Sequence, residues 1–236
     1  MSNKKTYIVM TAIVISLILL LVLILLISDR KDEKKSVQEN LLNINYETEG
    51  NEMNLEQYET TNPLVALYIK NYGSIVIELY PEIAENTVNN FISLVKNGFY
   101  DNNTFHRLVP GFVLQGGDPD GTGTGGPGYH IRGEFSINGY ENNLKHEEKV
   151  VSMARSQDYN SAGSQFFIML GEASYLDGSY AAFGKVIDGW DNIKKIVSQE
   201  KVIDEQTGKL QENLTIEKAV VDLKGKQYKE VEKIAD

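Results

Sequence analysis

The apolar residues that follow Pro63 stand at every second position, which is the period of a β-strand with one buried face. They form two runs on either side of Asn71-Tyr72-Gly73, which provides the turn. The runs are Val65, Leu67 and Ile69 before the turn and Ile75, Ile77 and Leu79 after it. This pattern predicts a β-hairpin.

Beyond Pro81 the apolar spacing changes to three and four residues, which is typical of a helix with one buried face. The helix is expected to end at Asn97-Gly98, because glycine commonly follows a helix C-terminus. The apolar positions that carry this pattern are Ala84, Val88, Phe91, Ile92 and Val95.

Later apolar runs predict further short strands and one more helix. The strands are expected at 111–115, 150–154, 164–170, 181–186 and 214–223, and the helix at 190–198. Residues 201–213 are interpreted as a surface loop before the last strand. Many short strands, few helices and no regular alternation of strand and helix favour an antiparallel barrel or sandwich.

The N-terminal region is different, because residues 7–27 carry no charge and consist mainly of Ile, Leu and Val. A helix of this length spans roughly 30 Å, which matches the bilayer core. A cleaved signal peptide would have a shorter apolar stretch and a small-residue cleavage site, which Leu25-Leu26-Ile27-Ser28 does not offer. A buried soluble helix would show a polar face. Residues 1–28 are therefore expected to be a basic tail and a single-pass transmembrane anchor.

Two patterns give opposite predictions for the side of the membrane on which the C-terminal domain lies. Lys4 and Lys5 precede the span, and four basic residues follow it between Arg30 and Lys35, so the positive-inside rule alone favours a cytoplasmic domain. A short basic tail before the first apolar segment is, however, the usual form of an export signal. We favour an extracytoplasmic domain at 63–236, joined by an acidic flexible linker at 29–62. A solvated helix around 37–44 is an alternative within that linker.

Composition excludes several classes of protein. The net charge is −10, which disfavours nucleic-acid binding because that requires basic surface. The chain has no cysteine, so no disulfide supports the fold. Its three histidines lack the spacing of a zinc site, so no metal is expected.

Two further motifs have simple interpretations. Gly121, Gly123 and Gly126 form a GxGxxG pattern, but Pro127-Gly128 follows it where a dinucleotide-binding loop would require a helix. We interpret this stretch as a long ordered loop that can pass close to a peptide backbone. Ser164 is not in a GxSxG nucleophile elbow, so hydrolase chemistry has no visible nucleophile.

Three segments together indicate a function that none of them indicates alone. The first is FHRLVPGFVLQGG at 105–117, which by itself could be an ordinary half-buried strand with a surface arginine. The second comprises SMAR at 152–155 and NSAGSQFFI at 160–168, and the third YLDG at 175–178 and FGKV at 183–186. In this order and at this spacing they resemble the cyclophilin family of peptidyl-prolyl cis/trans isomerases, over about 65–221.

This resemblance implies a mainly β fold, a closed eight-stranded antiparallel barrel capped by two α-helices, with a peptide groove on its outer surface. It also implies isomerisation of X-Pro bonds in proline-containing polypeptides without metal or cofactor. By resemblance the catalytic residues are Arg107, Phe112 and Gln115. The implied substrate-binding residues are His106, Val113, Ala154, Arg155, Gln165, Phe167, Tyr175, Leu176 and Tyr180.

The chemistry of these residue types suits the reaction. Rotation about an X-Pro bond is opposed by the conjugation of the amide, and no bond has to break. A permanently charged, planar guanidinium such as that of Arg107 can donate hydrogen bonds near the prolyl nitrogen, where a lone pair develops as the amide twists. Gln115 would hold the substrate backbone, and Phe112, Val113, Phe167 and Leu176 would grip the proline ring.

Three positions depart from the pattern of the eukaryotic or drug-sensitive members. Arg155 stands at the place of an asparagine, Tyr175 at that of a tryptophan, and Tyr180 at that of a histidine. We therefore expect only weak cyclosporin binding. The leading hypothesis is a monomeric, membrane-anchored isomerase that assists protein folding. The alternatives are a proline-peptide-binding chaperone with incidental turnover, and a docking module that does not use the pocket.

Overall fold

The computed structural model describes residues 53–234. The predicted membrane span and most of the predicted linker lie outside these residues. Within 53–234, no helix has both the length and the apolar character needed to cross a bilayer.

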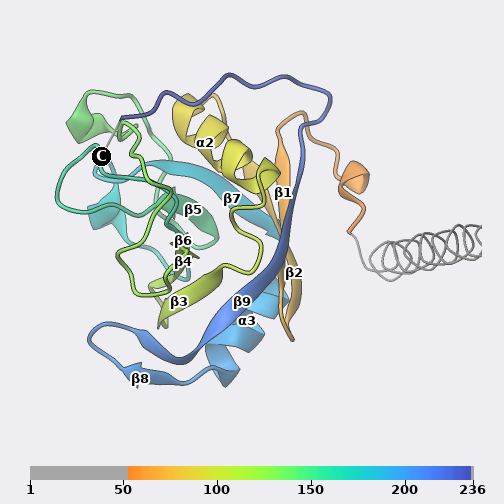
Figure 1. Cartoon of the computed structure of the whole chain (residues 1–236), viewed down its shortest axis with the longest axis vertical. Coiled ribbons are helices and arrows are strands. Elements are labelled where there is room, and N and C mark those ends of the chain that lie inside the picture. The colour runs from red at the N-terminus through yellow and green to blue at the C-terminus, as the bar shows by residue number, and fades with distance from the viewer. Residues whose placement is uncertain (1–52, 235–236) are drawn as a thin grey trace, which may run out of the picture. The chain divides into compact units, whose positions relative to one another are not determined.

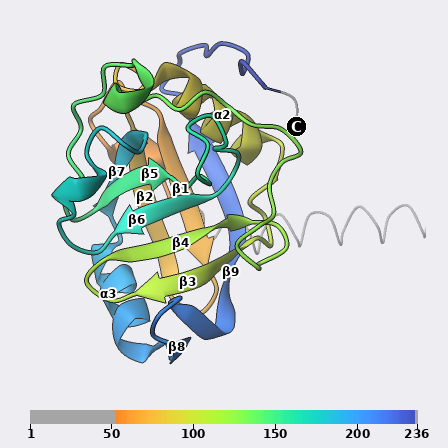
Figure 2. The ribbon, with the colours of Figure 1, turned by 90° about the vertical axis from the view of Figure 1, so that its left-hand side faces the viewer.

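The strands form one antiparallel sheet that closes on itself (Figures 1 and 2). Eight strands complete the ring in the order β1, β2, β7, β5, β6, β4, β3, β9, and β9 pairs back to β1, while β8 is attached outside the ring to β9. The strands are β1 (Leu64–Ile69), β2 (Gly73–Leu79), β3 (Thr104–Val109), β4 (Val113–Asp118), β5 (Val150–Met153), β6 (Phe166–Met169), β7 (Ala182–Asp188), β8 (Val202–Asp204) and β9 (Lys209–Asp222). The expected closed eight-stranded barrel is confirmed.

The predicted β-hairpin is formed by β1 and β2, which pair with Leu67 opposite Ile75. The turn between them requires a left-handed backbone at Asn71, whose φ is 68°, and asparagine tolerates this conformation better than most residues. The alternating apolar residues of both strands are buried, as their period of two predicts.

Two helices lie at opposite ends of the barrel in both views, α2 (Glu85–Lys96) and α3 (Trp190–Gln199). Both confirm helices predicted from apolar spacing. Residue Ala84, which precedes α2, provides no side-chain cap. Instead the buried carboxylate of Glu134 accepts hydrogen bonds from the backbone N–H groups of Asn86 (3.0 Å) and Thr87 (2.7 Å). A negative charge at a helix N-terminus is favourable, so a distant loop fixes the start of this helix.

The core is aromatic at its centre. Phe91 of α2 enters the barrel and contacts Tyr100, Phe166 and Phe183, with ring centroids 5.0 to 5.2 Å apart. All four rings are fully buried. Phe166 and Phe167 are adjacent on β6, so their side chains point to opposite faces of the sheet. The packing of Phe166 in the core therefore also positions Phe167 on the outer side of the barrel.

Residues 201–213 are not the surface loop that the sequence pattern predicts. They form β8 and the beginning of β9, joined by a tight turn, and Leu210 in this segment is buried. The wrong prediction has a physical cause, since most side chains of this hairpin are exposed and polar and give almost no period-two signal. Strand β3 was not among the strands predicted from apolar runs, and it is part of the ring.

Residues 53–62 belong to the predicted linker, but in the structure they lie against the barrel. A short 3₁₀ helix (Leu55–Gln57) buries Leu55, which packs with Leu64 and Val76. The hydroxyl of Tyr58 donates to Asp188. The single apolar side chain at Leu55 is too weak a periodic signal to be recognised in the sequence.

The C-terminal residues 223–234 extend over α2 (Figure 1). Asn86 on α2 exchanges two hydrogen bonds with the backbone of Glu232, both 2.9 Å. Ile234 forms a bridge with His130, with N–O distances of 2.8 and 2.9 Å. This segment therefore connects the helix to the loop that precedes β5.

Candidate active site

Arg107 and Gln115 face each other on neighbouring strands. They are cross-strand partners in the β3–β4 pair, and Arg107 Nη1 donates to Gln115 Oε1 at 3.2 Å. The other side of the guanidinium is also held, because Nε donates to the backbone carbonyl of Thr207 at 2.7 Å. Partial burial lowers the pKa of Arg107, although an arginine remains protonated at physiological pH. The result is a cation of fixed orientation.

Hydrogen bonds continue from Gln115 along the floor of the site. Gln115 Nε2 donates to Gln165 Oε1 at 3.0 Å, and Gln165 Nε2 donates to the carbonyl of Gly125 at 2.9 Å. Gly125 belongs to the glycine-rich loop. This loop is thus connected to the arginine through two amide side chains.

Asp118 holds the glycine-rich loop in place. Its carboxylate is almost fully buried and accepts hydrogen bonds from the backbone N–H groups of Asp120 (2.8 Å), Thr122 (3.0 Å) and Gly123. Burial alone would raise the pKa of Asp118, but these backbone donors and that of Gly125 hold it below the ordinary value. The long ordered loop predicted at this glycine-rich stretch is thus organised around a buried carboxylate.

An apolar cluster, expected to receive the proline ring and called the pocket below, lies next to Arg107. Phe167, Val113 and Leu176 are buried in one cluster, with Phe112, Ala154 and Tyr180 packed against them. The rings of Phe167 and Tyr180 meet edge to face at 5.9 Å. The guanidinium carbon of Arg107 lies 5.9 Å from the centre of the Phe112 ring. The predicted pocket residues are therefore brought together, beside the cation.

Tyr175 forms the rim. Its side chain stacks on Phe112 with ring centroids 6.1 Å apart, yet 71% of the residue is exposed. It can therefore contact a bound molecule without rearrangement.

Arg155 contacts Tyr180, one of the residues packed against this cluster. Its guanidinium donates twice to the carbonyl of Ser179, at 3.1 and 2.9 Å. Its central carbon is 5.2, 5.0 and 4.5 Å from the ring centres of Phe135, Tyr159 and Tyr180. The side chain thus packs on Tyr180, which in turn packs against the apolar cluster.

His106 is not placed with the other predicted substrate-binding residues. It stands at an irregularity of the β3–β4 pairing, is buried, and points toward the glycine-rich loop near Gly123. Among residues 53–234, no group hydrogen-bonds to either ring nitrogen. Burial lowers the pKa of His106, so the ring is neutral at physiological pH.

Sequence reasoning missed a buried polar group behind the pocket. His146 Nδ1 lies 3.1 Å from Asp177 Oδ1, and its Nε2 lies 3.0 Å from Ser152 Oγ. The imidazole stacks on Phe167 at 6.1 Å. Ser152 is fully buried, so this arrangement of Ser, His and Asp cannot present a nucleophile to a substrate. His146 instead connects Asp177, Ser152 and the ring of Phe167.

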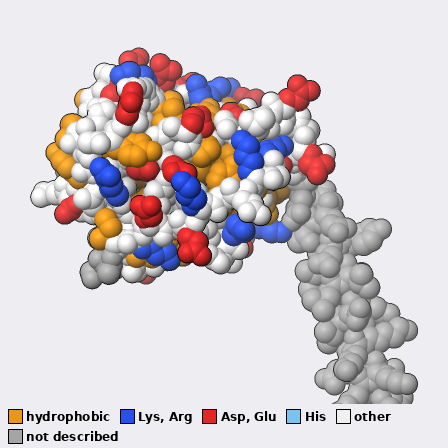
Figure 3. Space-filling view, turned by 90° about the horizontal axis from the view of Figure 1, so that it is seen from above, with side chains coloured by type: hydrophobic (Ala, Val, Ile, Leu, Met, Phe, Trp, Pro, Cys, Tyr) orange, Lys and Arg blue, Asp and Glu red, His pale blue; other side chains and the backbone are white. Residues whose placement is uncertain are grey.

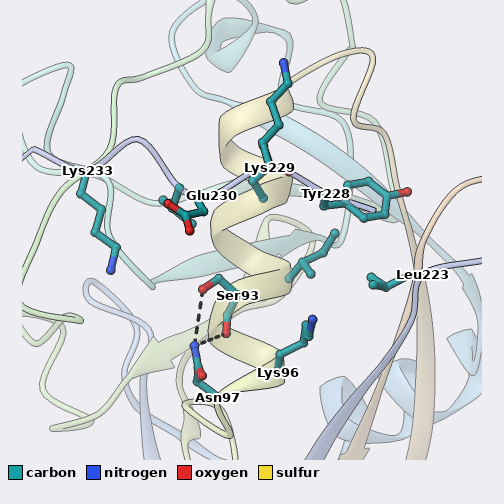
Figure 4. Close-up of a pocket in the computed structure, with 11 residues that line it drawn as sticks. Ser93, Lys96, Asn97, Leu223, Tyr228, Lys229, Glu230 and Lys233 are labelled. Carbon is teal, nitrogen blue, oxygen red and sulfur yellow. Dashed lines mark hydrogen bonds between the residues drawn. The ribbon is translucent and has the colours of Figure 1, made fainter. Parts of the chain in front are cut away.

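A hollow of about 530 Å³ lies elsewhere, between α2 and the C-terminal residues (Figure 4). Lys229 at its edge pairs with Glu85 at 2.8 Å, and Lys233 lies 4.1 Å from the centre of the Tyr129 ring. Seen from above, charged side chains of both signs are interspersed with hydrophobic ones on this face (Figure 3). None of the predicted site residues lines the hollow, and we assign it no role.

Comparison with known proteins decides the family. The family model described as cyclophilin type peptidyl-prolyl cis-trans isomerase/CLD matches residues 64–221, the whole barrel. The chain belongs to this family. As a cyclophilin it is a peptidyl-prolyl cis-trans isomerase, and the family assigned from three sequence motifs is confirmed.

Individual cyclophilins support the assignment. Peptidyl-prolyl cis-trans isomerase B of Bacillus subtilis is 46% identical over 128 residues, which are 54% of this chain and 86% of the relative. A Helicobacter pylori peptidyl-prolyl cis-trans isomerase is 40% identical over 132 residues, covering 56% and 78%. A Cryptosporidium parvum cyclophilin, solved in the presence of the dipeptide Ala-Pro, is 32% identical with a TM-score of 0.59, over 67% of this chain and 98% of that one.

Proposed function

We propose that this cyclophilin accelerates X-Pro rotation in protein chains by using Arg107 to stabilise the twisted amide. The observation that carries the proposal is the position of the guanidinium, held on two sides at the edge of the apolar pocket. The proline ring would occupy the pocket of Phe112, Val113, Phe167 and Leu176. The rest of the peptide would lie across the barrel surface.

The chemistry follows from the barrier. A planar amide resists rotation by about 18–20 kcal/mol because its nitrogen lone pair is conjugated with the carbonyl. In the twisted state that lone pair becomes available as a hydrogen-bond acceptor. A guanidinium that donates to it stabilises the transition state more than either planar form, which is the condition for catalysis.

Gln115 contributes in two ways. Both ends of its amide already bond to protein groups, Arg107 and Gln165, so it orients the guanidinium. A carbonyl oxygen has a second lone pair and an amide nitrogen a second hydrogen. Gln115 can therefore also hold the substrate backbone on the rotating side of the X-Pro bond.

The proposal extends to location on the evidence of sequence alone. Residues 7–27 would anchor the chain in the membrane as a single span, with the isomerase on the extracytoplasmic side. Its substrates would then be proline-containing chains emerging from the membrane. Protease added to intact cells tests this topology, because it should digest the barrel only if the barrel lies outside.

A second candidate function is a proline-peptide-binding chaperone in which turnover is incidental. The exposed aromatic rim at Tyr175 favours it, since such a side chain can bind extended segments without catalysis.

Exchange spectroscopy on an Ala-Pro peptide separates the two candidates. The full chain in detergent micelles should accelerate cis-trans exchange, and Arg107→Ala should lose the acceleration while still binding the peptide. Arg132→Ala is the matched control, because Arg132 is exposed and its hydrogen-bond acceptor within residues 53–234 is the Asn138 carbonyl. If Arg107→Ala retains full acceleration, the arginine mechanism is wrong, and if the wild-type chain only binds, the chaperone reading replaces it.

A further inference from the structure

The turn between β8 and β9 lies directly against the catalytic arginine. The Thr207 carbonyl accepts from Arg107 Nε at 2.7 Å, on the side of the guanidinium opposite to Gln115. The contact joins residues 100 positions apart in the chain. Because the acceptor is a backbone oxygen, its position depends on the conformation of the turn and not on the side chain at 207.

The turn is held rigidly. Asp204 Oδ1 accepts from the backbone N–H groups of Gln206 (2.9 Å) and Thr207 (3.3 Å), and the Asp204 carbonyl accepts from Gly208 N at 2.7 Å. The Gly208 carbonyl in turn accepts from Leu108 N at 2.8 Å. The turn is therefore fixed to the residue that follows Arg107 on β3.

Only glycine fits at position 208. Its φ is +75°, which strains other residues. A Cβ there would lie 2.6 Å from Val109 Cγ2, 2.8 Å from the Leu108 carbonyl oxygen and 3.2 Å from Arg107 Cγ. This close approach brings the Thr207 carbonyl within reach of the guanidinium.

The hairpin contributes little to the core through β8. Ile203 is 58% exposed and Asp204 is exposed, while the buried anchor, Leu210, belongs to β9. Strand β8 also stands outside the closed ring. Burial by β8 therefore does not explain why the turn that follows it is hydrogen-bonded so closely to β3.

We propose that the Thr207–Gly208 turn is a positioning element for catalysis. With Nε held by Thr207 and Nη1 by Gln115, the guanidinium is fixed in orientation beside Phe112. The inference rests on the proposed function of Arg107 and adds a second structural support for it. The turn acts through the arginine and does not itself contact the substrate.

The test compares two glycine variants of the full chain in detergent micelles. Gly208→Ala disturbs the turn, whereas Gly225→Ala introduces the same left-handed strain at φ +71° with no atom near the new Cβ. An Ala-Pro peptide reports the exchange rate at saturation, and chemical-shift titration reports its Kd. We expect Gly208→Ala to slow bound exchange about tenfold, the effect of one charged hydrogen bond, with Kd within about twofold. Gly225→Ala should change neither.

One more variant and one more background complete the test. Asp204→Ala loosens the turn without a steric clash and should also slow exchange, so it replaces Gly208→Ala if that variant does not fold. In an Arg107→Ala background, neither substitution should slow exchange further. If a folded turn variant keeps the wild-type rate, or slows exchange equally without Arg107, the inference is overturned. A wild-type chain without acceleration would instead overturn the proposed function itself.

Discussion

Arg107 and Gln115 are paired across two adjacent strands, and the guanidinium donates to the amide oxygen at 3.2 Å. Gln115→Leu keeps the approximate shape of the side chain but removes both of its hydrogen bonds. A hydrogen bond to a charged group contributes about 1.5–3 kcal/mol, so bound exchange of an Ala-Pro peptide should slow about tenfold or more. Gln199→Leu, at an exposed position at the end of α3, should have no effect in the same NMR experiment. An unchanged rate in Gln115→Leu would show that the pairing does not matter.

Tyr175 determines the expected response to cyclosporin. Its ring is exposed and stacked on Phe112, so the larger indole of Tyr175→Trp can be accommodated at the rim. The indole adds apolar area and a different donor, an N–H. Titration calorimetry should show cyclosporin binding several-fold tighter to Tyr175→Trp than to the wild-type chain. Equal affinity would mean that another residue limits binding, and Tyr72→Trp, remote from the pocket, serves as the control.

Glu134 is predicted to matter for stability and not for catalysis. It accepts hydrogen bonds from the first turn of α2 and from the hydroxyl of Thr87. Glu134→Gln removes the charge and places a donor group against other donors. Urea unfolding should show that Glu134→Gln lowers the free energy of unfolding by about 2 kcal/mol. Glu217→Gln, at an exposed position on β9, should leave the free energy of unfolding unchanged. A loss of exchange activity in a folded Glu134→Gln variant would contradict this assignment.

The stability of the domain should depend on histidine protonation. Burial lowers the pKa of both His106 and His146, so each ring stays neutral in the folded state at a pH where it is protonated in the unfolded state. The unfolded state then binds more protons below about pH 6.5, the ordinary histidine pKa, and the free energy of unfolding falls as the pH decreases from there.

The urea midpoint between pH 8 and pH 5 measures this dependence. We expect it to fall below about pH 6.5 in the wild-type chain and to fall less steeply in His146→Gln. Asp118 and Asp177, whose pKa values are lowered, stabilise the fold above about pH 4, and this contribution is lost as the pH falls through their folded values. A midpoint that stays constant or rises on acidification to pH 5 would contradict the neutral buried histidines.

Sequence patterns predicted the parts of the fold in which burial is periodic. The residues of the β1–β2 hairpin and of helix α2 that enter the core repeat at the matching periods of two and of three to four, although the outer face of β1 is also covered, by Leu55. Strand β8 has no buried face and was predicted as a loop. Leu55 was assigned to the linker because one buried side chain does not create a period.

Some residues of the site could be recognised in the sequence and others could not. Arg107, Phe112, Gln115 and Phe167 lie in motifs that are recognisable in sequence, and the structure brings them together. His146 and Asp177 are 31 residues apart and meet only in the folded chain. Thr207 contributes a backbone carbonyl, and any residue type in the same backbone conformation could supply it. The residue type at 207 therefore gives no sign of this contact in the sequence.

The most direct test of the account compares wild-type protein with Arg107→Lys in the same exchange experiment. Lysine keeps the positive charge but lacks the planar group of donors that Thr207 and Gln115 hold on two sides. We predict that exchange of the bound Ala-Pro peptide slows about tenfold or more, while Kd changes less than about twofold, because the lost interaction acts on the twisted amide. Exchange at the wild-type rate in Arg107→Lys would contradict the central claim that an oriented guanidinium performs the catalysis.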